Sequence, residues 1–368
     1  MNRTANRFVP GLLAVALIAA ACSGGDDDAD TADATTSTVE ATTTVASTTV
    51  APTTTTTVPA TTTTTIPDVL RMPLTGEPLD DPDDVPDRPA LIVKISNAPQ
   101  SILPQSGLND ADLVIEEIIN DSVTRLAAVY HSTESDPVGP IRSGRAQDIN
   151  LLLALNRPLF AWSGGNPAVT RAVRDSDLID LDARFNSGYY RRSGRRDANT
   201  LYSSTDVLWA QTPEEAGRPP RLFPYLPVGE EPDGEPATEI NVSLDSIRAE
   251  WTYDEESGRY FRTQNGQEHT TEQGGEINRV WADNVVVMMA DYGLNPADGN
   301  PDAQVLGSNP IYVFSGGTVR VGTWLRFKPT DPLDIFDNVD DLNTIGLTPG
   351  RTWLEIPRNV DDVLSWTG

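Results

Sequence analysis

A single cysteine, Cys22, constrains this chain more than any other residue, because its 368 residues include no second one. Intramolecular disulfides, thiolate catalysis and zinc-thiolate sites are therefore excluded from the mature fold. Cys22 follows Arg3, Arg7 and an apolar run at 9–21, which is the pattern of a secretory signal. The run is too short to span a bilayer, which takes about 20 residues.

The residues before the cysteine predict a lipid anchor. Residues 17–22 read LIAAAC, which is similar to a lipobox whose leucine is displaced from the third to the fifth position before cysteine. We expect residues 1–22 to be a lipoprotein signal peptide that ends at a lipidated Cys22, holding the protein on the extracytoplasmic face of the cell membrane. The alternative is cleavage by an ordinary signal peptidase, which would release a free exported protein.

Residues 23–68 are expected to be a disordered tether. Threonine, alanine, proline and aspartate dominate this segment, so almost no large side chain can be buried to offset the entropy lost on ordering. A plain spacer is one interpretation, and a spacer that carries O-linked sugars on its threonines is the other.

The remaining sequence predicts two domains. Predicted strands and helices alternate over 69–216, which indicates an α/β domain. The strands are expected at 90–95, 113–119, 125–131 and 159–162, and the helices at 145–156, 167–174 and 205–211. A Pro- and Gly-rich linker is expected at 217–236. Residues 237–368 are expected to form a mostly β domain, with strands at 285–290, 311–314, 319–321, 324–327 and 353–356 and one short helix at 340–345.

Charge and histidine content limit the chemistry. The formal net charge is −27 at pH 7, and such an acidic surface repels nucleic acid, which is therefore not an expected partner. His131 and His269 are the only histidines, and the sequence has neither a Gly-x-Ser-x-Gly elbow nor a His-Glu-x-x-His motif. We expect no cofactor and no metal, and the catalytic residues, if any, remain unknown.

Several different short segments, spread along most of the chain, follow one another in a specific order. They are Pro73–Gly76, Arg88–Ala90, Asn97, Pro104–Leu108, Ala111–Asp112, Glu116, Thr124–Arg125, Gly139–Arg145, Gly164–Gly165, Asn199–Tyr202 and His269. Together they resemble the YerB-like lipoprotein family, whose domains have no known function. The turn Asn120–Ser122 departs from the Glu-Gly-Gly of that family, and Gly144 stands where the family has alanine. The resemblance implies an envelope lipoprotein with an N-terminal and a C-terminal domain, and it implies no established reaction.

The segment 139–145 contains the best candidate for a ligand site. If a helix begins near Ser143, its free N–H groups and the guanidinium groups of Arg142 and Arg145 would form an anion-binding site. Arg125, from the preceding strand, would contribute a third guanidinium group. Candidates to support the same pocket are Asn97, Asp112, Glu116, Gly164 and Gly165. The alternative is structural: the arginines pair inside the fold with Asp112, Glu116 and Glu117.

Two other groups of residues suggest chemistry. Glu116 and Glu117 invite comparison with a glycosidase pair, but neighbours on a strand point to opposite faces and cannot flank one bond. The most basic part of the chain, at 171–196, interleaves Tyr189 and Tyr190 with Arg171, Arg174, Arg184, Arg191, Arg192, Arg195 and Arg196. It is either a solvated loop or a contact for carbohydrate or an anionic polymer.

Two classes of function remain open. The first is a non-catalytic binding or regulatory protein of the cell envelope, whose partner is a cell-wall polymer or an envelope protein. The second is an enzyme that acts on phosphate-bearing or acidic envelope glycans, with the arginines stabilising charge and an Asp or Glu as base.

Overall fold

The computed structural model describes residues 69–98, 103–195, 198–338, 340 and 342–368. The predicted signal peptide, Cys22 and the tether at 23–68 lie outside the described residues. Within the described residues, no helix is long and apolar enough to cross a membrane.

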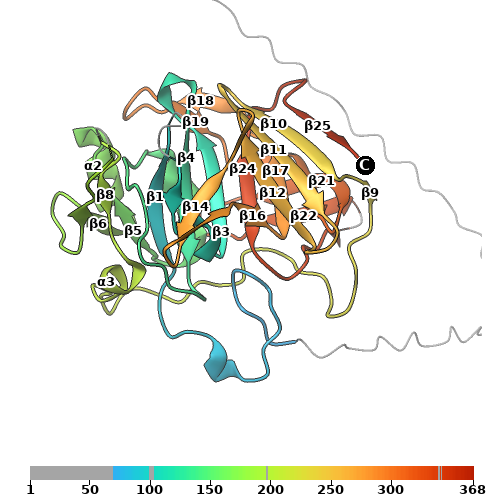
Figure 1. The fold of residues 1–368 in the computed structure, drawn as a ribbon, viewed down its shortest axis with the longest axis horizontal. Helices are drawn as coiled ribbons and strands as arrows, with labels where there is room; N and C mark the ends of the chain where they lie inside the picture. The colour runs from blue at the N-terminus through green and yellow to red at the C-terminus, as the bar shows by residue number, and fades with distance from the viewer. Residues whose placement is uncertain (1–68, 99–102, 196–197, 339, 341) are drawn as a thin grey trace, which may run out of the picture. The chain divides into compact units, whose positions relative to one another are not determined.

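One large mixed sheet contains strands from both halves of the chain (Figure 1). Its order is β23–β22–β21–β20–β17–β24–β3–β4–β1–β5–β6, and β9 pairs with β21. The bounds are β1 (Leu91–Asn97), β3 (Leu113–Ile118), β4 (Thr124–Tyr130), β5 (Leu159–Trp162), β6 (Ile179–Asp182), β9 (Glu235–Pro236), β17 (Asn284–Met288), β20 (Gly307–Ser315), β21 (Thr318–Arg326), β22 (Asp334–Asn338), β23 (Asn343–Thr344) and β24 (Thr352–Ile356). Parallel pairing of β24 with β3 joins the two halves, so hydrogen bonding is continuous across them.

A second sheet is formed by the C-terminal half alone, in the order β13–β12–β11–β10–β25 with β16 paired to β12. Its strands are β10 (Glu239–Leu244), β11 (Ile247–Asp254), β12 (Arg259–Gln264), β13 (Gln267–Glu268), β16 (Trp281–Ala282) and β25 (Leu364–Thr367). Three small sheets complete the strands: β2 (Gln105–Ser106) with β14 (Thr270–Gln273) and β15 (Glu276–Arg279), β7 (Tyr190–Arg191) with β8 (Leu201–Tyr202), and β18 (Tyr292–Leu294) with β19 (Pro301–Ala303).

The described helices are short. They are α1 (Gln147–Leu152), α2 (Pro167–Arg174), α3 (Thr205–Trp209) and the 3-10 turns η1 (Pro82–Asp84), η3 (Leu108–Asp110), η4 (Asn120–Ser122) and η5 (Leu153–Leu155). Helix α2 begins as its sequence predicts, because the Asn166 side chain accepts a hydrogen bond from the Val169 N–H at 2.9 Å and Pro167 occupies the first turn.

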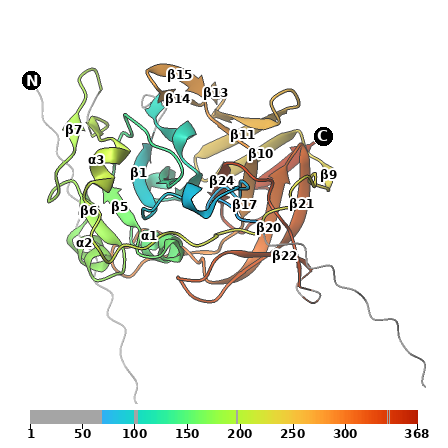
Figure 2. The same ribbon diagram turned by 90° about the horizontal axis from the view of Figure 1, so that it is seen from below.

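Two apolar cores lie on opposite faces of the large sheet. Along β1, Leu91 and Val93 face the core shared with the second sheet, whereas Ile92 faces the core shared with α1 and α2. This alternation is the two-residue period of a strand. Figure 2 shows β10 and β11 on one side of the large sheet and α1 and α2 on the other.

Several sequence-based predictions are confirmed and others are wrong. Strands at 159–162 and 353–356, and the hairpin that joins β20 to β21, lie where they were expected. The α/β character expected for 69–216 holds only in part, because the described chain is mostly β and its helices are few and short. The helix expected at 340–345 is wrong, since Asn343–Thr344 forms β23 and pairs with β22.

Candidate functional site

Three arginines from two segments gather on the helix-bearing face of the large sheet. Arg125 lies on β4, and Arg142 and Arg145 lie between β4 and α1. The backbone of Arg142 is fixed to β1, because its N–H donates to the Lys94 carbonyl at 2.8 Å. Arg125 is only 5% exposed and lies within the electrostatic range of the other two. We call Arg125, Arg142 and Arg145 the arginine cluster.

No guanidinium of the arginine cluster forms an ion pair with a carboxylate of the described residues. Arg125 donates from Nη1 to the Thr124 carbonyl at 3.2 Å. Arg145 donates to the Gly144 carbonyl at 2.9 Å and to Asn120 Oδ1 at 2.6 Å. The Nε atoms of all three arginines are buried without a hydrogen-bond partner. Those Nε atoms are closed to solvent, but the Nη atoms of Arg142 have no hydrogen-bond partner among the described residues and are not fully buried, so they can donate to an anion.

The positive charges of the cluster disfavour one another. Burial, and then the charges of Arg142 and Arg145, lower the pKa of the Arg125 guanidinium. Burial and the charge of Arg145 lower the pKa of Arg142 in the same way. The chain therefore keeps repelling positive charges together at a cost in stability.

The carboxylates nearest to the cluster are already engaged. Lys94 Nζ donates to Glu117 Oε1 at 2.5 Å and to Asp148 Oδ1 at 2.8 Å, and all three side chains are fully buried. Glu117 lies opposite Arg125 in the β3–β4 register, yet its Oε2 has no hydrogen-bond partner. Burial, and then the charge of Asp148, raise the pKa of Glu117 to about 7. The arginine cluster and Lys94 therefore outnumber Glu117 and Asp148, the carboxylates described beside them.

The helix-start part of the predicted site is wrong. Helix α1 begins at Gln147, not near Ser143, and it has only six residues. Asp148 Oδ2 accepts a hydrogen bond from the Arg145 N–H at 2.6 Å, so this backbone donor is already used. Binding of an anion there depends on the guanidinium groups and not on a helix terminus.

Ser143, Gly164 and Gly165 lie beside the cluster. Gly164 has a φ of +89°, and a Cβ on it would stand 3.3 Å from Ser143 Oγ. A Cβ on Gly165 would stand 2.9 Å from the Trp162 ring. The hydroxyl of Ser143 makes no hydrogen bond with another described residue and is half-buried. The glycines thus allow the chain to pass close to Ser143 and leave its hydroxyl available.

Asn97 and Glu116, proposed as supporting residues, lie on the other face of the sheet. Glu116 Oε1 accepts from Asn97 Nδ2 at 2.8 Å and from Thr124 Oγ1 at 2.7 Å, and Oε2 accepts from Arg262 at 2.8 Å. The structure does not bring them to the arginine cluster.

Asp112 is also placed elsewhere. Its Oδ2 accepts hydrogen bonds from the backbone N–H groups of His131, at 2.5 Å, and Ser132, at 3.0 Å. Burial raises the pKa of this carboxyl, although the Ser132 hydroxyl counteracts the shift. Asp112 therefore anchors the end of β4 rather than a ligand.

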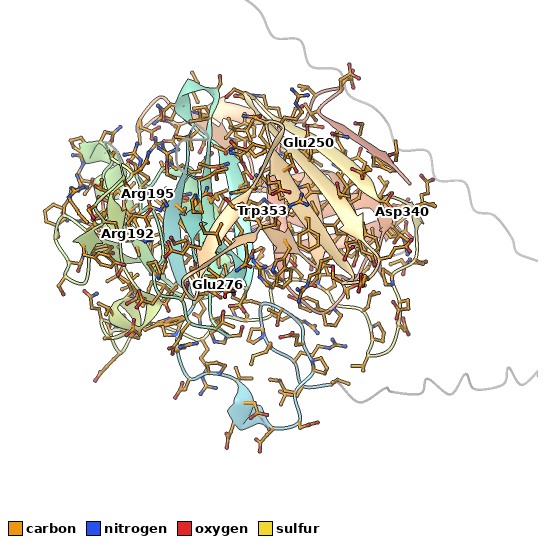
Figure 3. All side chains as sticks on the ribbon, in the orientation of Figure 1. Arg192, Arg195, Glu250, Glu276, Asp340 and Trp353 are labelled. Carbon is orange, nitrogen blue, oxygen red and sulfur yellow. The ribbon has the colours of Figure 1, made fainter. Side chains whose placement is uncertain are left out.

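A buried polar network between the two sheets was missed by sequence reasoning. Arg262 is fully buried and donates to Glu116, to Gln264 at 2.7 Å and to His269 Nδ1 at 2.6 Å. His269 Nε2 then donates to Gln105 Oε1 at 2.8 Å, and burial holds the pKa of His269 well below its usual range. Trp353 donates to Glu116 and lies near the middle of the side-chain view in Figure 3. Glu355 accepts from Trp251 at 2.8 Å.

Within the basic run at 171–196, the part at 184–196 is largely paired. Arg192 forms an ion pair with Glu272 at 2.6 Å, and Arg195 donates to the Pro104 carbonyl at 2.6 Å; both are labelled in Figure 3. Arg184 pairs with Asp182. These contacts hold the segment against the rest of the fold. Arg196 lies outside the described residues.

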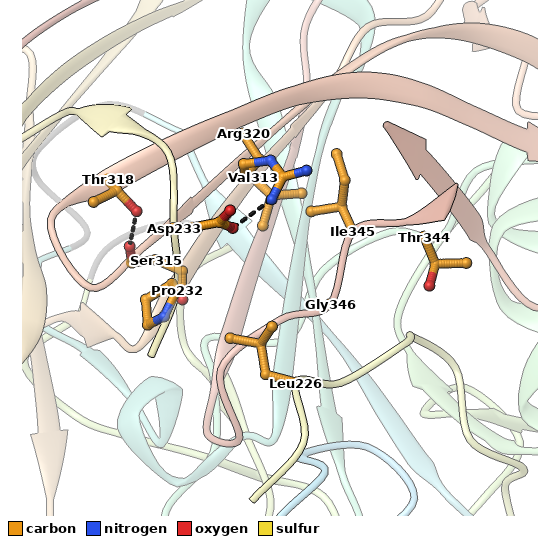
Figure 4. A pocket seen from close by; sticks show the side chains of 10 residues that line it. All are labelled: Leu226, Pro232, Asp233, Val313, Ser315, Thr318, Arg320, Thr344, Ile345 and Gly346. Atoms are coloured by element: carbon orange, nitrogen blue, oxygen red, sulfur yellow. Dashed lines mark hydrogen bonds and ion pairs between the residues drawn. The ribbon is translucent and has the colours of Figure 1, made fainter. Parts of the chain in front are cut away.

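The pocket in Figure 4 offers little room for a ligand. Its volume is about 50 Å³, and Arg320 in its wall forms ion pairs with Asp233 and Asp337. That space suits one or two waters. Among the described residues, no group of three or more His, Cys, Asp or Glu side chains is arranged to hold a metal ion.

Comparison with known proteins finds matches to a family, to a relative and to a solved structure. The model of the N-terminal domain of "Protein of unknown function (DUF3048)" matches residues 74–218, and that of its C-terminal domain matches residues 239–354. The chain is 25% identical over 304 residues to the putative lipoprotein YerB of Bacillus subtilis (strain 168), which covers 79% of this chain and 87% of that protein. It resembles the crystal structure of the YerB protein from Bacillus subtilis with a TM-score of 0.69 and 22% identity, covering 81% of this chain and 100% of the other. This last likeness is one of fold.

Proposed function

Because the chain belongs to the YerB-like family, which is built from the N-terminal and C-terminal DUF3048 domains, we propose that it is a membrane-anchored envelope lipoprotein that binds an anionic partner on the arginine cluster. The partner is a phosphate-bearing cell-wall polymer or a protein that presents such a group. One observation carries the proposal: three arginines share a site in which no described carboxylate forms an ion pair with them.

The chemistry of the cluster favours phosphate. A guanidinium can donate two parallel hydrogen bonds to phosphate or carboxylate oxygens. Three guanidinium groups in a half-buried site supply more donors and more charge than a single carboxylate can use. Neutralising the mutual repulsion of Arg125, Arg142 and Arg145 adds to the binding free energy.

Binding is favoured over catalysis by the state of the nearby carboxylates. An enzyme would need an Asp or Glu beside the arginines with access to substrate. Glu117 and Asp148 are the carboxylates whose charges act on Arg125, and both are fully buried and hydrogen-bonded to Lys94. An enzyme of phosphate-bearing glycans remains the alternative, and it would need a base from another molecule or segment.

The binding proposal can be tested on the purified full-length protein by titration with a synthetic glycerol phosphate oligomer. Arg142→Ala should weaken binding by about tenfold or more, since a charge-assisted hydrogen bond is worth roughly 1.5–3 kcal/mol. Arg248→Ala is the matched control, because Arg248 is an exposed arginine of β11 in the second sheet. Equal affinities for the two variants would refute the site.

The membrane anchor has its own test. We propose that acyl chains on Cys22 hold the protein at the membrane, supported by the match to a putative lipoprotein. Cys22→Ala should block processing or release soluble protein on fractionation. A processed Cys22→Ala protein that still sediments with membranes would contradict the anchor.

A further inference from the structure

A cavity of about 330 Å³ opens between β20 of the large sheet and β25 of the second sheet. Its walls include Met289, Pro310 and Leu364, and its lining includes the rings of Tyr312 and Trp366. None of the arginine cluster lines it. A volume near 300 Å³ is at the lower end of the range for small-molecule sites.

The two aromatic rings are partly exposed and keep their polar atoms unused. Their centroids lie 5.7 Å apart with an interplanar angle of 53°. Neither the Tyr312 hydroxyl nor the Trp366 indole N–H makes a hydrogen bond with a described residue, and neither atom is fully buried. The lining of the cavity thus includes two aromatic residues whose polar atoms have no partner among the described residues.

Trp366 differs in this from the tryptophans of the core. Those that donate their indole N–H to a protein acceptor are Trp162, Trp209, Trp251, Trp324 and Trp353. In Trp281 the ring is covered instead by the guanidinium groups of Arg259 and Arg351, whose centres lie 3.6 and 4.3 Å from its centroid. Packing therefore accounts for the polar atoms or ring faces of the others. The Trp366 ring packs edge-on against Phe314 at 6.0 Å, but its N–H has no partner among the described residues and is not fully buried.

Carboxylates complete the edge of the cavity. Asp361 and Asp362 line it, both are exposed, and neither makes a hydrogen bond or ion pair with a described residue. Carboxylates only accept hydrogen bonds, whereas the Trp366 indole only donates. They also repel anionic ligands. An ammonium ligand could pair with the carboxylates but would offer no acceptor to the indole N–H, whereas a sugar hydroxyl group both donates and accepts.

We propose that this cavity is a binding site for an uncharged sugar ring. The C–H faces of a pyranose pack against Tyr312 and Trp366, and its hydroxyl groups donate to Asp361 and Asp362 and accept from the indole N–H. The site goes beyond the function proposed above, because it uses other residues and another ligand chemistry.

The experiment titrates the purified full-length protein with two neutral probes, an N-acetylglucosamine tetramer and a glucose tetramer. Ligand-observed NMR detects the binding. At least one should bind. A galacturonate tetramer and a glucosamine tetramer serve as the anionic and cationic comparisons, and both should bind more weakly. Binding by neither neutral probe, or preference for a charged probe, would overturn the proposal.

Variants locate the binding. Trp366→Ala should weaken neutral-sugar affinity by about tenfold, the size expected for loss of one good contact. Asp362→Asn should also weaken it, and this change keeps the positive φ of 63° at a residue type that tolerates it, so folding should be unaffected. Phe327→Ala removes an aromatic ring that is 72% exposed elsewhere, and Arg142→Ala disables the arginine cluster; neither should alter sugar affinity. Unchanged affinity in both Trp366→Ala and Asp362→Asn would refute the site.

Discussion

Glu116 and Glu117 are neighbours on β3, yet each pairs with a different cation on a different face of the large sheet. Glu116 accepts from Arg262 at 2.8 Å between the two sheets, and Glu117 accepts from Lys94 at 2.5 Å on the face that carries α1. The two-residue period of the strand separates them, so the sheet itself divides a structural network from the arginine cluster.

The Glu116–Arg262 pair should be essential for stability. Glu116→Ala leaves the fully buried Arg262 guanidinium with only the more distant Glu355 carboxylate, at 3.7 Å, and breaking a buried pair in this way costs roughly 3 to 5 kcal/mol. Denaturant unfolding measures the loss. Removal of the exposed Arg157–Asp177 pair by Arg157→Ala is the control and should cost about 1 kcal/mol or less. Similar costs for the two variants would show that Glu116 is not the anchor described here.

The free energy of unfolding should fall as pH rises toward the pKa of the Glu355 carboxyl. Burial, opposed by the charge of Arg262, raises the pKa of this carboxyl from 4.5 to about 8. A raised carboxyl pKa favours the protonated folded state, so its contribution is complete below pH 4.5 and is lost as pH rises toward 8. Glu117, with a pKa raised to about 7, acts in the same direction.

The useful window for this test lies above pH 6.5. The pKa of His131 is lowered from 6.5 to about 4, mainly by burial, so its contribution opposes the glutamates only in the acid range. Glu355→Gln keeps an acceptor for Trp251 and should reduce the loss of stability between pH 6.5 and about 8 by roughly 1 to 2 kcal/mol. An unchanged pH slope in unfolding measurements would mean that Glu355 is ionised throughout.

The start of α2 offers a smaller, local test. Asn166→Ala removes the side-chain acceptor for the Val169 N–H and should cost about 1 kcal/mol. Asn166→Asp, which keeps the acceptor, should retain most of that stability in the same thermal scan. Equal losses would indicate that the cap contributes nothing.

The local elements were predictable, whereas the long-range pairings were not. The continuous aliphatic run of β1 and the Asn166-Pro167 start of α2 are signals contained in a few neighbouring residues. Glu116 and Arg262 are 146 residues apart, and no local spacing indicates that they meet. The same reason explains the error at β23, whose strand depends on pairing with β22.

For the candidate site, sequence reasoning found the arginines but not their setting. Arg142 and Arg145 stood out because two cations lie beside glycine in an acidic chain. The engagement of Glu117 by Lys94 follows only from the pairing of β1 with β4 and of β4 with β3. His269 gave one signal in the sequence, since it is one of only two histidines. The structure places it inside the buried network.

The arginine cluster should be a cost to the free protein. Arg142→Met keeps much of the apolar stem and removes one of the mutually repelling charges, so its melting temperature without ligand should equal or exceed that of the wild type. If the arginines were structural partners of buried carboxylates, the same change would destabilise the fold by roughly 3 to 5 kcal/mol. Thermal unfolding at low ionic strength separates the two cases.

The most direct test of an anion site is the effect of inorganic phosphate on thermal unfolding of the full-length protein, compared between wild type and Arg142→Met. A ligand that binds only the folded state stabilises it by about 2.7 kcal/mol at a hundred times its dissociation constant. Phosphate also stabilises proteins in general, and the variant reports that common effect. We predict a melting temperature that rises clearly more in the wild type than in Arg142→Met; equal rises in the two proteins would contradict the anion site.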